Sequence, residues 1–196
     1  MRAAVSSLLI VAIAHTSPAA AGMTALERQR LVAHLETTGA WLVDEVSGLS
    51  PAQLAFKPSA DAWSIMEVLD HLVVVGPIYW QDLQAALKMP AEGRESLSSD
   101  ADILWYGIDR TAREKAIPTE VPKGEVRSLA SALDTYRKAH DRLLDYARKT
   151  TDDLRAHVVR RQGSDAYQWA LLISTHEQRH ILQIREIKAD PRFPKK

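Results

Sequence analysis

Residues 169–187 read WALLISTHEQRHILQIREI, and their apolar side chains recur at steps of three and four residues. This spacing predicts one buried face of an α-helix, with His176 and His180 both on that face. The two imidazoles are about 40° apart around such a helix and about 6 Å apart along it. Both can therefore bind one ion, provided that a third ligand is supplied from elsewhere.

The motif H-E-x-x-H within this stretch is typical of metalloproteases, which take their third ligand from further along the chain. Here the position of the later histidine holds Glu186. Its side chain would be turned roughly 80 to 120° from the two histidines and about 9 Å beyond His180, so it cannot complete the site. A ferritin-like carboxylate centre needs two E-x-x-H helices, and only Glu177 with His180 has that spacing. The sequence disfavours both classes.

His71 is the better source of a third ligand. It stands beside an apolar stripe of another predicted helix, where an imidazole without a partner would be costly to bury: Val68, Leu72 and Val75. Three neutral imidazoles suit zinc, nickel, copper or iron(II), and they leave positions open for water or substrate. His140, on an inward stripe of a further helix, is the best candidate for a fourth ligand. A non-catalytic site closed by four protein ligands remains the alternative.

Capping signatures and apolar spacing predict four long helices. The first two run from Thr24 to about Val46 and from Ser64 to about Lys88, each with a capping signature, and the other two run from near Ser128 to about Lys149 and from near Asp165 to a point before Pro191. Pro77 is expected to kink or divide the second of them. The chain is therefore predicted to be all-α, an up-down four-helix bundle whose sites are built from inward side chains.

The segments between these helices are harder to assign. Residues 47–63 are predicted to be a loop, and residues 90–124 a long crossover between helices two and three, with a shorter helix from Ala101 to Ala116. The run AHVVRR, residues 156–161, is the only short stretch with strand character. One strand has nothing to pair with, so no sheet is expected.

Composition limits the classes of function. The chain has 196 residues, 46% of them hydrophobic, which suits one globular domain. Lysine plus arginine equals aspartate plus glutamate at 25 each, without a basic block, so nucleic acid is not an expected partner. There is no cysteine, which excludes disulfides, thiolate metal sites and cysteine nucleophiles.

The first residues have the features of a signal peptide. Arg2 precedes an uncharged apolar run from Ala3 to Ala14, and Ala19 and Ala21 have the spacing that a signal peptidase reads. We expect residues 1–21 to be removed and residues 22–196 to form the mature domain, exported to the periplasm or the medium. A frayed helix or an uncleaved anchor is the alternative, although the run is shorter than the ~20 residues that span a bilayer.

Several neighbours of the histidines have two interpretations each. Glu177 could act as a general base or be a solvated helix residue. Gln183 could orient a ligand or make an ordinary buried hydrogen bond, and Glu67 could support His71 or simply cap its helix. Four tryptophans could line a substrate pocket but more often belong to a core: Trp63, Trp80, Trp105 and Trp169. Arg110, with its neighbours Arg113 and Lys115, could bind an anionic substrate or remain solvated.

Two segments resemble a known family. The stretch LSPAQLAFKPSADAWSIMEVLDHL, residues 49–72, is similar to the entry to the second helix in the DinB/YfiT-like superfamily, with its W-S-x-x-E-x-x-x-H-L pattern. The stretch STHEQRHILQI, residues 174–184, resembles the H-x-x-x-H-x-x-Q-I signature of the same superfamily. The resemblance implies a four-helix bundle in which His71, His176 and His180 hold a divalent ion, with zinc and nickel favoured.

The resemblance also implies an activity. Members are mostly described as metal-dependent hydrolases of small molecules, relatives transfer or isomerise substrates with low-molecular-weight thiols, and many are dimers. Because cytosolic thiols are not expected outside the inner membrane, export favours hydrolysis, in which metal-bound water attacks the substrate. The alternatives are a non-catalytic bundle that is stabilised by metal or binds a ligand, and a thiol-dependent transferase if the chain stays in the cytosol. After signal cleavage no membrane partner is expected, and a homodimer is an open alternative.

Overall fold

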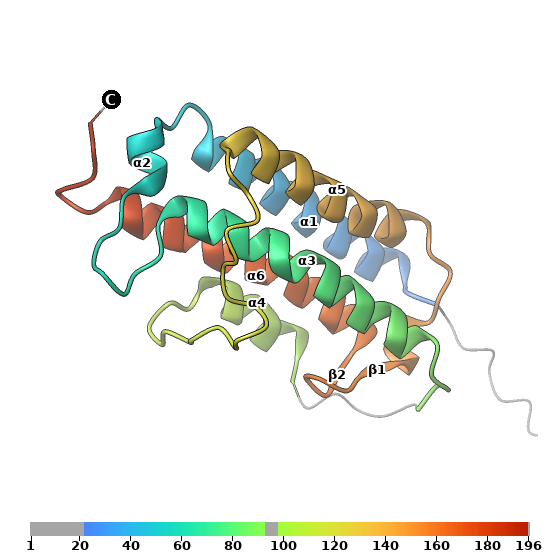
Figure 1. The fold of residues 1–196 in the computed structure, drawn as a ribbon. Coiled ribbons are helices and arrows are strands. Elements are labelled where there is room, and N and C mark those ends of the chain that lie inside the picture. The colour runs from blue at the N-terminus through green and yellow to red at the C-terminus, as the bar shows by residue number, and fades with distance from the viewer. Residues whose placement is uncertain (1–21, 93–97, 196) are drawn as a thin grey trace, which may run out of the picture.

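The computed structural model describes residues 22–92 and 98–195 (Figure 1). The predicted signal peptide, residues 1–21, lies outside the described residues. The described chain is mostly helical, as its sequence predicts, with one small two-stranded sheet. None of its helices is both long and apolar enough to cross a membrane.

The first two long helices begin at the predicted caps. Helix α1 covers Ala25–Val46 and α3 covers Ile65–Leu87. Each begins with a capping box, Thr24 with Glu27 and Ser64 with Glu67, in which side chains satisfy the free N–H groups of the first turn. Pro77 lies inside α3 without dividing it.

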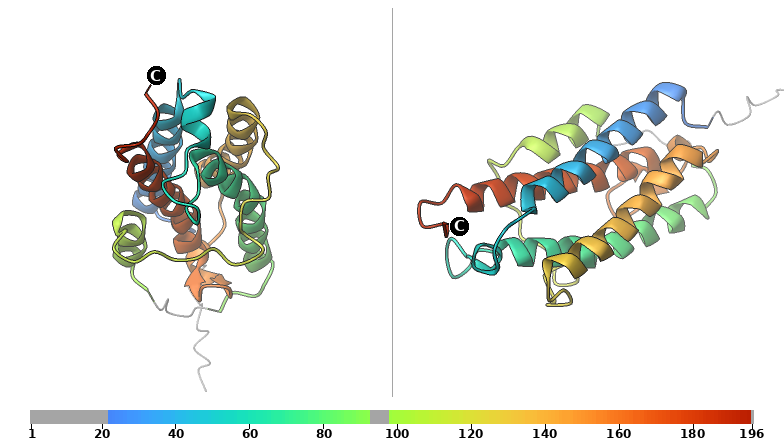
Figure 2. Two further views of the ribbon diagram at one scale, coloured as in Figure 1. Left: turned by 60° about the vertical axis from the view of Figure 1, so that its left-hand side comes forward. Right: turned by 90° about the horizontal axis from the view of Figure 1, so that it is seen from above.

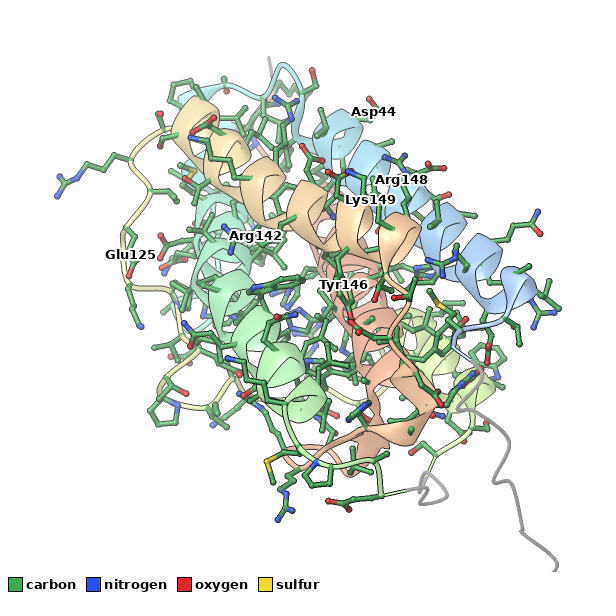
Figure 3. The ribbon with its side chains drawn as sticks, turned by 90° about the vertical axis from the view of Figure 1, so that its right-hand side faces the viewer. Asp44, Glu125, Arg142, Tyr146, Arg148 and Lys149 are labelled. Atoms are coloured by element: carbon green, nitrogen blue, oxygen red, sulfur yellow. The ribbon has the colours of Figure 1, made fainter. Side chains whose placement is uncertain are left out.

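The last two long helices start near the predicted positions, each after a polar cap residue. Helix α5 covers Leu129–Lys149 after Ser128, and α6 covers Ala166–Lys188 after Asp165. Most of the side chains of α6 are buried, which makes it the central helix of the fold. The outward face of α5 instead carries exposed charged side chains, among them Arg142 and Lys149 (Figure 3).

The four long helices lie side by side. Both α1 and α3 pack against α5 and α6, and all three views show the four aligned along one direction (Figures 1 and 2). Buried apolar side chains form two clusters. One contains Leu35, Tyr79 and Trp169, and the other contains Leu42 and Ile181. Between these clusters lie mostly polar positions: Thr38 on α1, His140 on α5 and Ser174–His180 on α6. The helices therefore hold a polar layer at mid-length.

Helix α2, Pro51–Ala55, corrects the loop that was predicted for residues 47–63. Its signal is present in the sequence, because Ser50 and Gln53 form a capping box with Pro51 at the first helical position. Helix α4, Asp100–Ile108, is shorter than the helix predicted as far as Ala116. It ends at Asp109, whose backbone is extended and whose carboxylate accepts hydrogen bonds from Thr111.

A short hairpin corrects the prediction that there is no sheet. After the 3-10 turn η1, Leu154–Ala156, strand β1, Val158–Val159, pairs in antiparallel fashion with β2, Ser164–Asp165. Gly163 has φ 65°, a left-handed conformation that allows the chain to reverse between the strands. Strand β1 lies within residues 156–161, the stretch with strand character, whereas β2 was missed because a strand of two residues is too short to show alternation.

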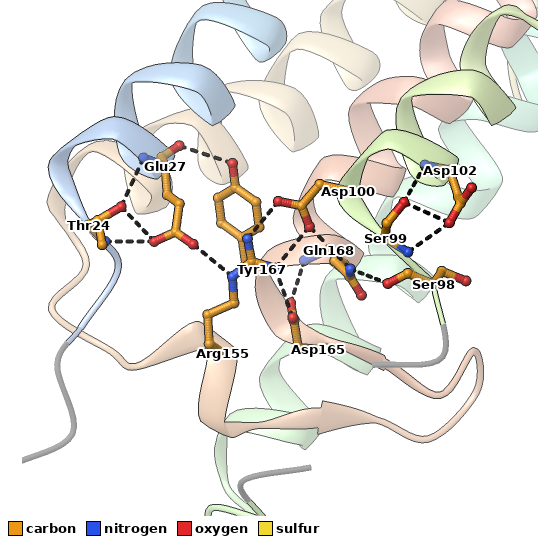
Figure 4. A network of polar contacts seen from close by, with 10 residues as sticks. All are labelled: Thr24, Glu27, Ser98, Ser99, Asp100, Asp102, Arg155, Asp165, Tyr167 and Gln168. Atoms are coloured by element: carbon orange, nitrogen blue, oxygen red, sulfur yellow. Dashed lines mark hydrogen bonds and ion pairs between the residues drawn. The ribbon is translucent and has the colours of Figure 1, made fainter. Parts of the chain in front are cut away.

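Arg155 joins the starts of three helices (Figure 4). Its guanidinium lies 2.8 Å from Glu27 at the start of α1, 2.7 Å from Asp100 at the start of α4 and 2.8 Å from Asp165 at the cap of α6. Acidic groups at helix N-termini are favoured by the helix dipole, and here one guanidinium pairs with three of them. This network fixes the end of α6 that lies before the histidines.

Candidate metal centre

The structure brings together the three predicted histidine ligands. The Nε2 atom of His176 lies 3.2 Å from Nε2 of His71 on α3 and 3.1 Å from Nε2 of His180, one turn further along α6. Each residue offers one ligand atom, and these three atoms all lie within 4.8 Å of one another. Among residues 22–92 and 98–195, no other such group of histidine and carboxylate side chains is found.

Hydrogen bonds at the far side of two rings direct their Nε2 atoms inward. Nδ1 of His71 lies 2.5 Å from the backbone carbonyl oxygen of Glu120, and Nδ1 of His180 lies 2.8 Å from Oε1 of Gln183. Because carbonyl oxygens only accept, both Nδ1 atoms donate a proton, which leaves a lone pair on each Nε2 of the neutral rings. Partners of this kind fix the tautomer of metal-binding histidines.

The spacing of the Nε2 atoms fits a metal ion. A proton on Nε2 of His176 can be directed at only one of its two neighbours, so at least one of the two contacts of about 3 Å is left without a hydrogen bond. Nitrogen ligands at about 2.0–2.1 Å from a tetrahedral zinc ion are roughly 3.3 Å apart. The observed separations of 3.1 and 3.2 Å match that arrangement. The three buried histidines could therefore hold a metal ion.

The surroundings keep the three imidazoles neutral. Burial, followed by repulsion from His71, Arg179 and Arg161, lowers the pKa of His176 to about 3. Burial and the neighbouring imidazoles hold the pKa of His180 well below 6.5. Burial also lowers the pKa of His71, against the opposing effect of the Glu120 carbonyl. Neutral imidazole is the form that binds metal, so protons do not compete for these sites near pH 7.

Aromatic rings and the crossover enclose the three histidines. The ring centroid of Trp63 lies 5.1 Å from that of His71 and 6.3 Å from that of His180, and Tyr79 packs edge-on against His176 at 5.4 Å. All three histidines are buried, with 8% exposure or less. Of the four tryptophans, Trp63 therefore contacts the candidate metal ligands, whereas Trp169 belongs to the hydrophobic core and Trp105 is 64% exposed.

Glu120 and Arg161 are parts of the site that sequence reasoning missed. Glu120 is buried in the crossover, and its carboxylate forms a close ion pair with Arg161 and lies 3.5 Å from the hydroxyl of Tyr79. Arg161, from the hairpin turn, also pairs with Asp82 at 3.3 Å. Neither residue lies on a periodic helical stripe, so no pattern in the sequence singled them out.

Glu177 lies in a second polar cluster, between α1, α5 and α6. Its carboxylate oxygens are 3.1 and 3.2 Å from Nδ1 of His140, and Thr38 donates to one of them at 3.2 Å. The hydroxyl of Tyr136 is also 3.2 Å from Nδ1 of His140. Both Glu177 and His140 are buried, and His140 is not part of the group of metal-ligating atoms. The general-base role of Glu177 stays a prediction.

A small cavity adjoins this second cluster. It has a volume of about 30 Å³, and its lining includes Leu72 and Gly76 of α3, Ala139 and His140 of α5, and Glu177 of α6. A cavity of this size holds one or two water molecules.

The remaining candidates have structural partners. Glu67 completes the capping box of α3 and pairs with Lys57 at 2.7 Å. Arg110 pairs with Glu186 through two hydrogen bonds of 2.9 Å, and Arg113 is largely exposed. Of the neighbours weighed in the sequence, Gln183 contacts a histidine of the centre directly.

Comparisons with known proteins show the family of the chain. A family model of the DinB superfamily matches residues 25–184, which contain all three histidines. The chain is 31% identical over 160 residues to YuaE of Bacillus subtilis strain 168, described as uncharacterised, and the match covers 80% of this chain and 93% of that protein. No solved structure matches the chain. Because the family model spans most of its length, this protein belongs to the DinB superfamily.

Proposed function

We propose that the protein holds one divalent metal ion through His71, His176 and His180 and acts as a metal-dependent hydrolase on a small molecule. One observation carries this proposal. Three buried Nε2 atoms meet at ligand spacing, while the outer nitrogens of two rings are held by Glu120 and Gln183. Zinc and nickel are the favoured ions, because neutral imidazoles of this number suit both.

The ligand set favours catalysis over a purely structural site. Structural zinc sites have four protein ligands, whereas catalytic ones have three and leave a position for water or substrate. No fourth histidine or carboxylate joins the group within the described residues. When bound, a divalent ion supplies Lewis acidity and makes water a nucleophile near neutral pH. The protein's own residues orient the imidazoles and, through Trp63 and the crossover, limit the access of bulk water.

A non-catalytic metal site is the second candidate function. Its support is the burial of all three imidazoles beneath Trp63 and the crossover. In that case the ion would stabilise the packing of α3 against α6, because a ligand that binds only the folded state raises its stability. Metal binding alone is common to both candidates.

The wider proposal includes the arrangement and the location of the chain. We infer an up-down bundle of α1, α3, α5 and α6, supported by the contacts of α1 and α3 with α5 and α6. Export by the segment 1–21 remains part of the proposal, and it favours hydrolysis over thiol-dependent transfer. A homodimer is the assembly proposed from the family resemblance.

The test uses metal-loaded protein and chromogenic esters, amides and phosphate esters. The hydrolase proposal expects turnover of at least one class that is lost with His176→Ala and with a chelator, and that is retained in the matched variant His157→Ala. Turnover that requires an added low-molecular-weight thiol would move the protein to the transferase class. If metal binds but all three classes remain unhydrolysed, and spectroscopy of the cobalt-loaded protein shows four protein ligands, the non-catalytic candidate replaces hydrolysis.

A further inference from the structure

Asp70, the residue before His71 on α3, is buried, and its hydrogen-bond partners are backbone groups of the segment that follows the crossover helix α4. Its carboxylate accepts hydrogen bonds from the backbone N–H groups of Lys123 at 2.5 Å, Gly124 at 2.7 Å and Val126 at 2.9 Å. Gly124 has φ 70°, and this left-handed conformation allows neighbouring N–H groups to converge on one anion. The carboxylate is therefore the anchor of this turn.

The anchored turn is joined by a short stretch of chain to the carbonyl that holds His71. Glu120 precedes Lys123 by three positions, and Pro122 between them has a fixed φ and lacks an N–H group. The Glu120 carbonyl oxygen lies 2.5 Å from Nδ1 of His71. Asp70 and His71 thus hold two points of the same segment of crossover from adjacent positions on one helix.

The crossover is held in a similar way on its other side. Arg179, the residue before His180 on α6, is buried and donates to the backbone carbonyl oxygens of Tyr106, Asp109 and Ala112. The residue before a predicted ligand therefore anchors the crossover on both helices that carry the ligands. The residues that hold the crossover thus lie next to the predicted ligands in the sequence.

We propose that Asp70 is a positioning residue of the metal centre, because its hold on residues 123–126 keeps the Glu120 carbonyl on Nδ1 of His71. That contact selects the tautomer in which Nε2 of His71 carries the lone pair and faces His176. Asp70 acts through the crossover and does not itself ligate. This inference rests on the proposed metal function.

Asp70→Asn is the main variant. The amide has one acceptor oxygen and one NH₂ donor, so either Val126 or the pair Lys123 and Gly124 faces a donor in place of an acceptor. Asp165→Asn is the matched control, because Asp165 is also buried and accepts a backbone N–H, from Gln168, at 2.7 Å. Its pair with Arg155 lies at the start of α6, about three turns before His176. Gly124→Ala is a second variant that strains the turn without altering α3, since an added Cβ meets nothing within 4 Å.

Two measurements are made on each protein. In metal-free protein, long-range ¹H–¹⁵N NMR reads the tautomer of the His71 ring, and a competition titration then measures the affinity for Zn²⁺. We expect wild type and Asp165→Asn to show the Nδ1–H tautomer and equal affinity. We expect Asp70→Asn to show mixed tautomers and Zn²⁺ affinity about 10- to 100-fold weaker, and Gly124→Ala to change in the same direction.

The two readouts separate this inference from the proposal on which it rests. If wild type binds no Zn²⁺, the metal function fails, and the His71 tautomer alone still decides the role of Asp70. If Asp70→Asn and Gly124→Ala keep the wild-type tautomer, Asp70 is a structural anchor only and the inference is overturned. A loss of stability shared by Asp70→Asn and Asp165→Asn, with the tautomer unchanged in both, overturns it in the same way.

Discussion

The Nε2 atoms of His71 and His176 lie 3.2 Å apart, although the residues are separated by 105 positions in the sequence. The chain between these two helices passes through the crossover with α4, through α5 and through the β1–β2 hairpin, and the fold nevertheless brings the two imidazoles together. Neutral nitrogens in this arrangement could hold a metal ion.

Gln183 is expected to strengthen metal binding through His180. Gln183→Leu removes the acceptor for Nδ1 of His180, and the loss of such a partner typically weakens metal affinity about 10- to 100-fold. Gln183→Glu keeps an acceptor at the same reach and is expected to keep affinity within a few-fold of wild type. Competition titrations with Zn²⁺ measure all three proteins. Equal affinity in Gln183→Leu would assign Gln183 an ordinary structural hydrogen bond.

His140 is expected to make stability depend on pH. Burial opposes protonation of His140, but the Glu177 carboxylate outweighs it and raises the pKa above 6.5. The folded state then binds more protons than the unfolded state, so this contribution is complete below about pH 6.5 and is lost as pH rises through the raised pKa.

Urea unfolding of metal-free protein between pH 6 and 9 measures this effect. Wild type should lose stability over the range relative to Glu177→Gln, which lacks the carboxylate. If the stability of the two proteins changed with pH in the same way, the result would contradict the interaction between His140 and Glu177.

Gly39 on α1 is expected to be required by the ring of His140. A Cβ built at Gly39 would lie 2.6 Å from Nε2 of His140, too close for a buried ring that cannot move freely. Alanine in a helix interior is ordinarily about 0.5–1 kcal/mol better than glycine, but overpacking of this kind costs about 1–3 kcal/mol. Gly39→Ala should therefore destabilise wild type and stabilise the His140→Ala protein, as read by denaturant unfolding. The same sign in both backgrounds would argue against the close packing.

Arg155 is expected to be a main stabilising residue outside the centre. Arg155→Ala leaves Glu27, Asp100 and Asp165 without their shared cation. Because the side chain is 32% exposed, solvent reduces the loss to about 2 kcal/mol, which corresponds to a fall in Tm of about 4–8 °C. Arg160→Ala is the control, since that exposed pair with Glu92 should contribute below about 1 kcal/mol. Equal Tm values for the two variants would refute this role.

Local signals in the sequence predicted the helices and the three histidines. The caps at Thr24, Ser64, Ser128 and Asp165 mark helix starts in the structure, because capping is a contact within one turn. His71, His176 and His180 could be grouped since each lies on an inward helical stripe. The same local rules also identified Pro77 as unusual, although the helix continues through it.

The partners of the histidines could not be predicted in the same way. Glu120 contributes a backbone carbonyl from an irregular crossover, and any residue type can supply a carbonyl. The contact of Glu177 with His140 joins α6 to α5 and depends on the rotation of both helices about their axes. Periodicity places each side chain on a face of its own helix, but it does not indicate which other helix that face contacts.

The most direct test of the central claim is the metal content of protein purified without a polyhistidine tag. Elemental analysis of wild type is expected to find about one divalent ion per chain, with His71→Ala nearly free of metal and the matched variant His157→Ala unchanged. Equal metal in wild type and His71→Ala, or none in a wild-type protein offered Zn²⁺ and Ni²⁺, would contradict the claim that these three imidazoles share an ion.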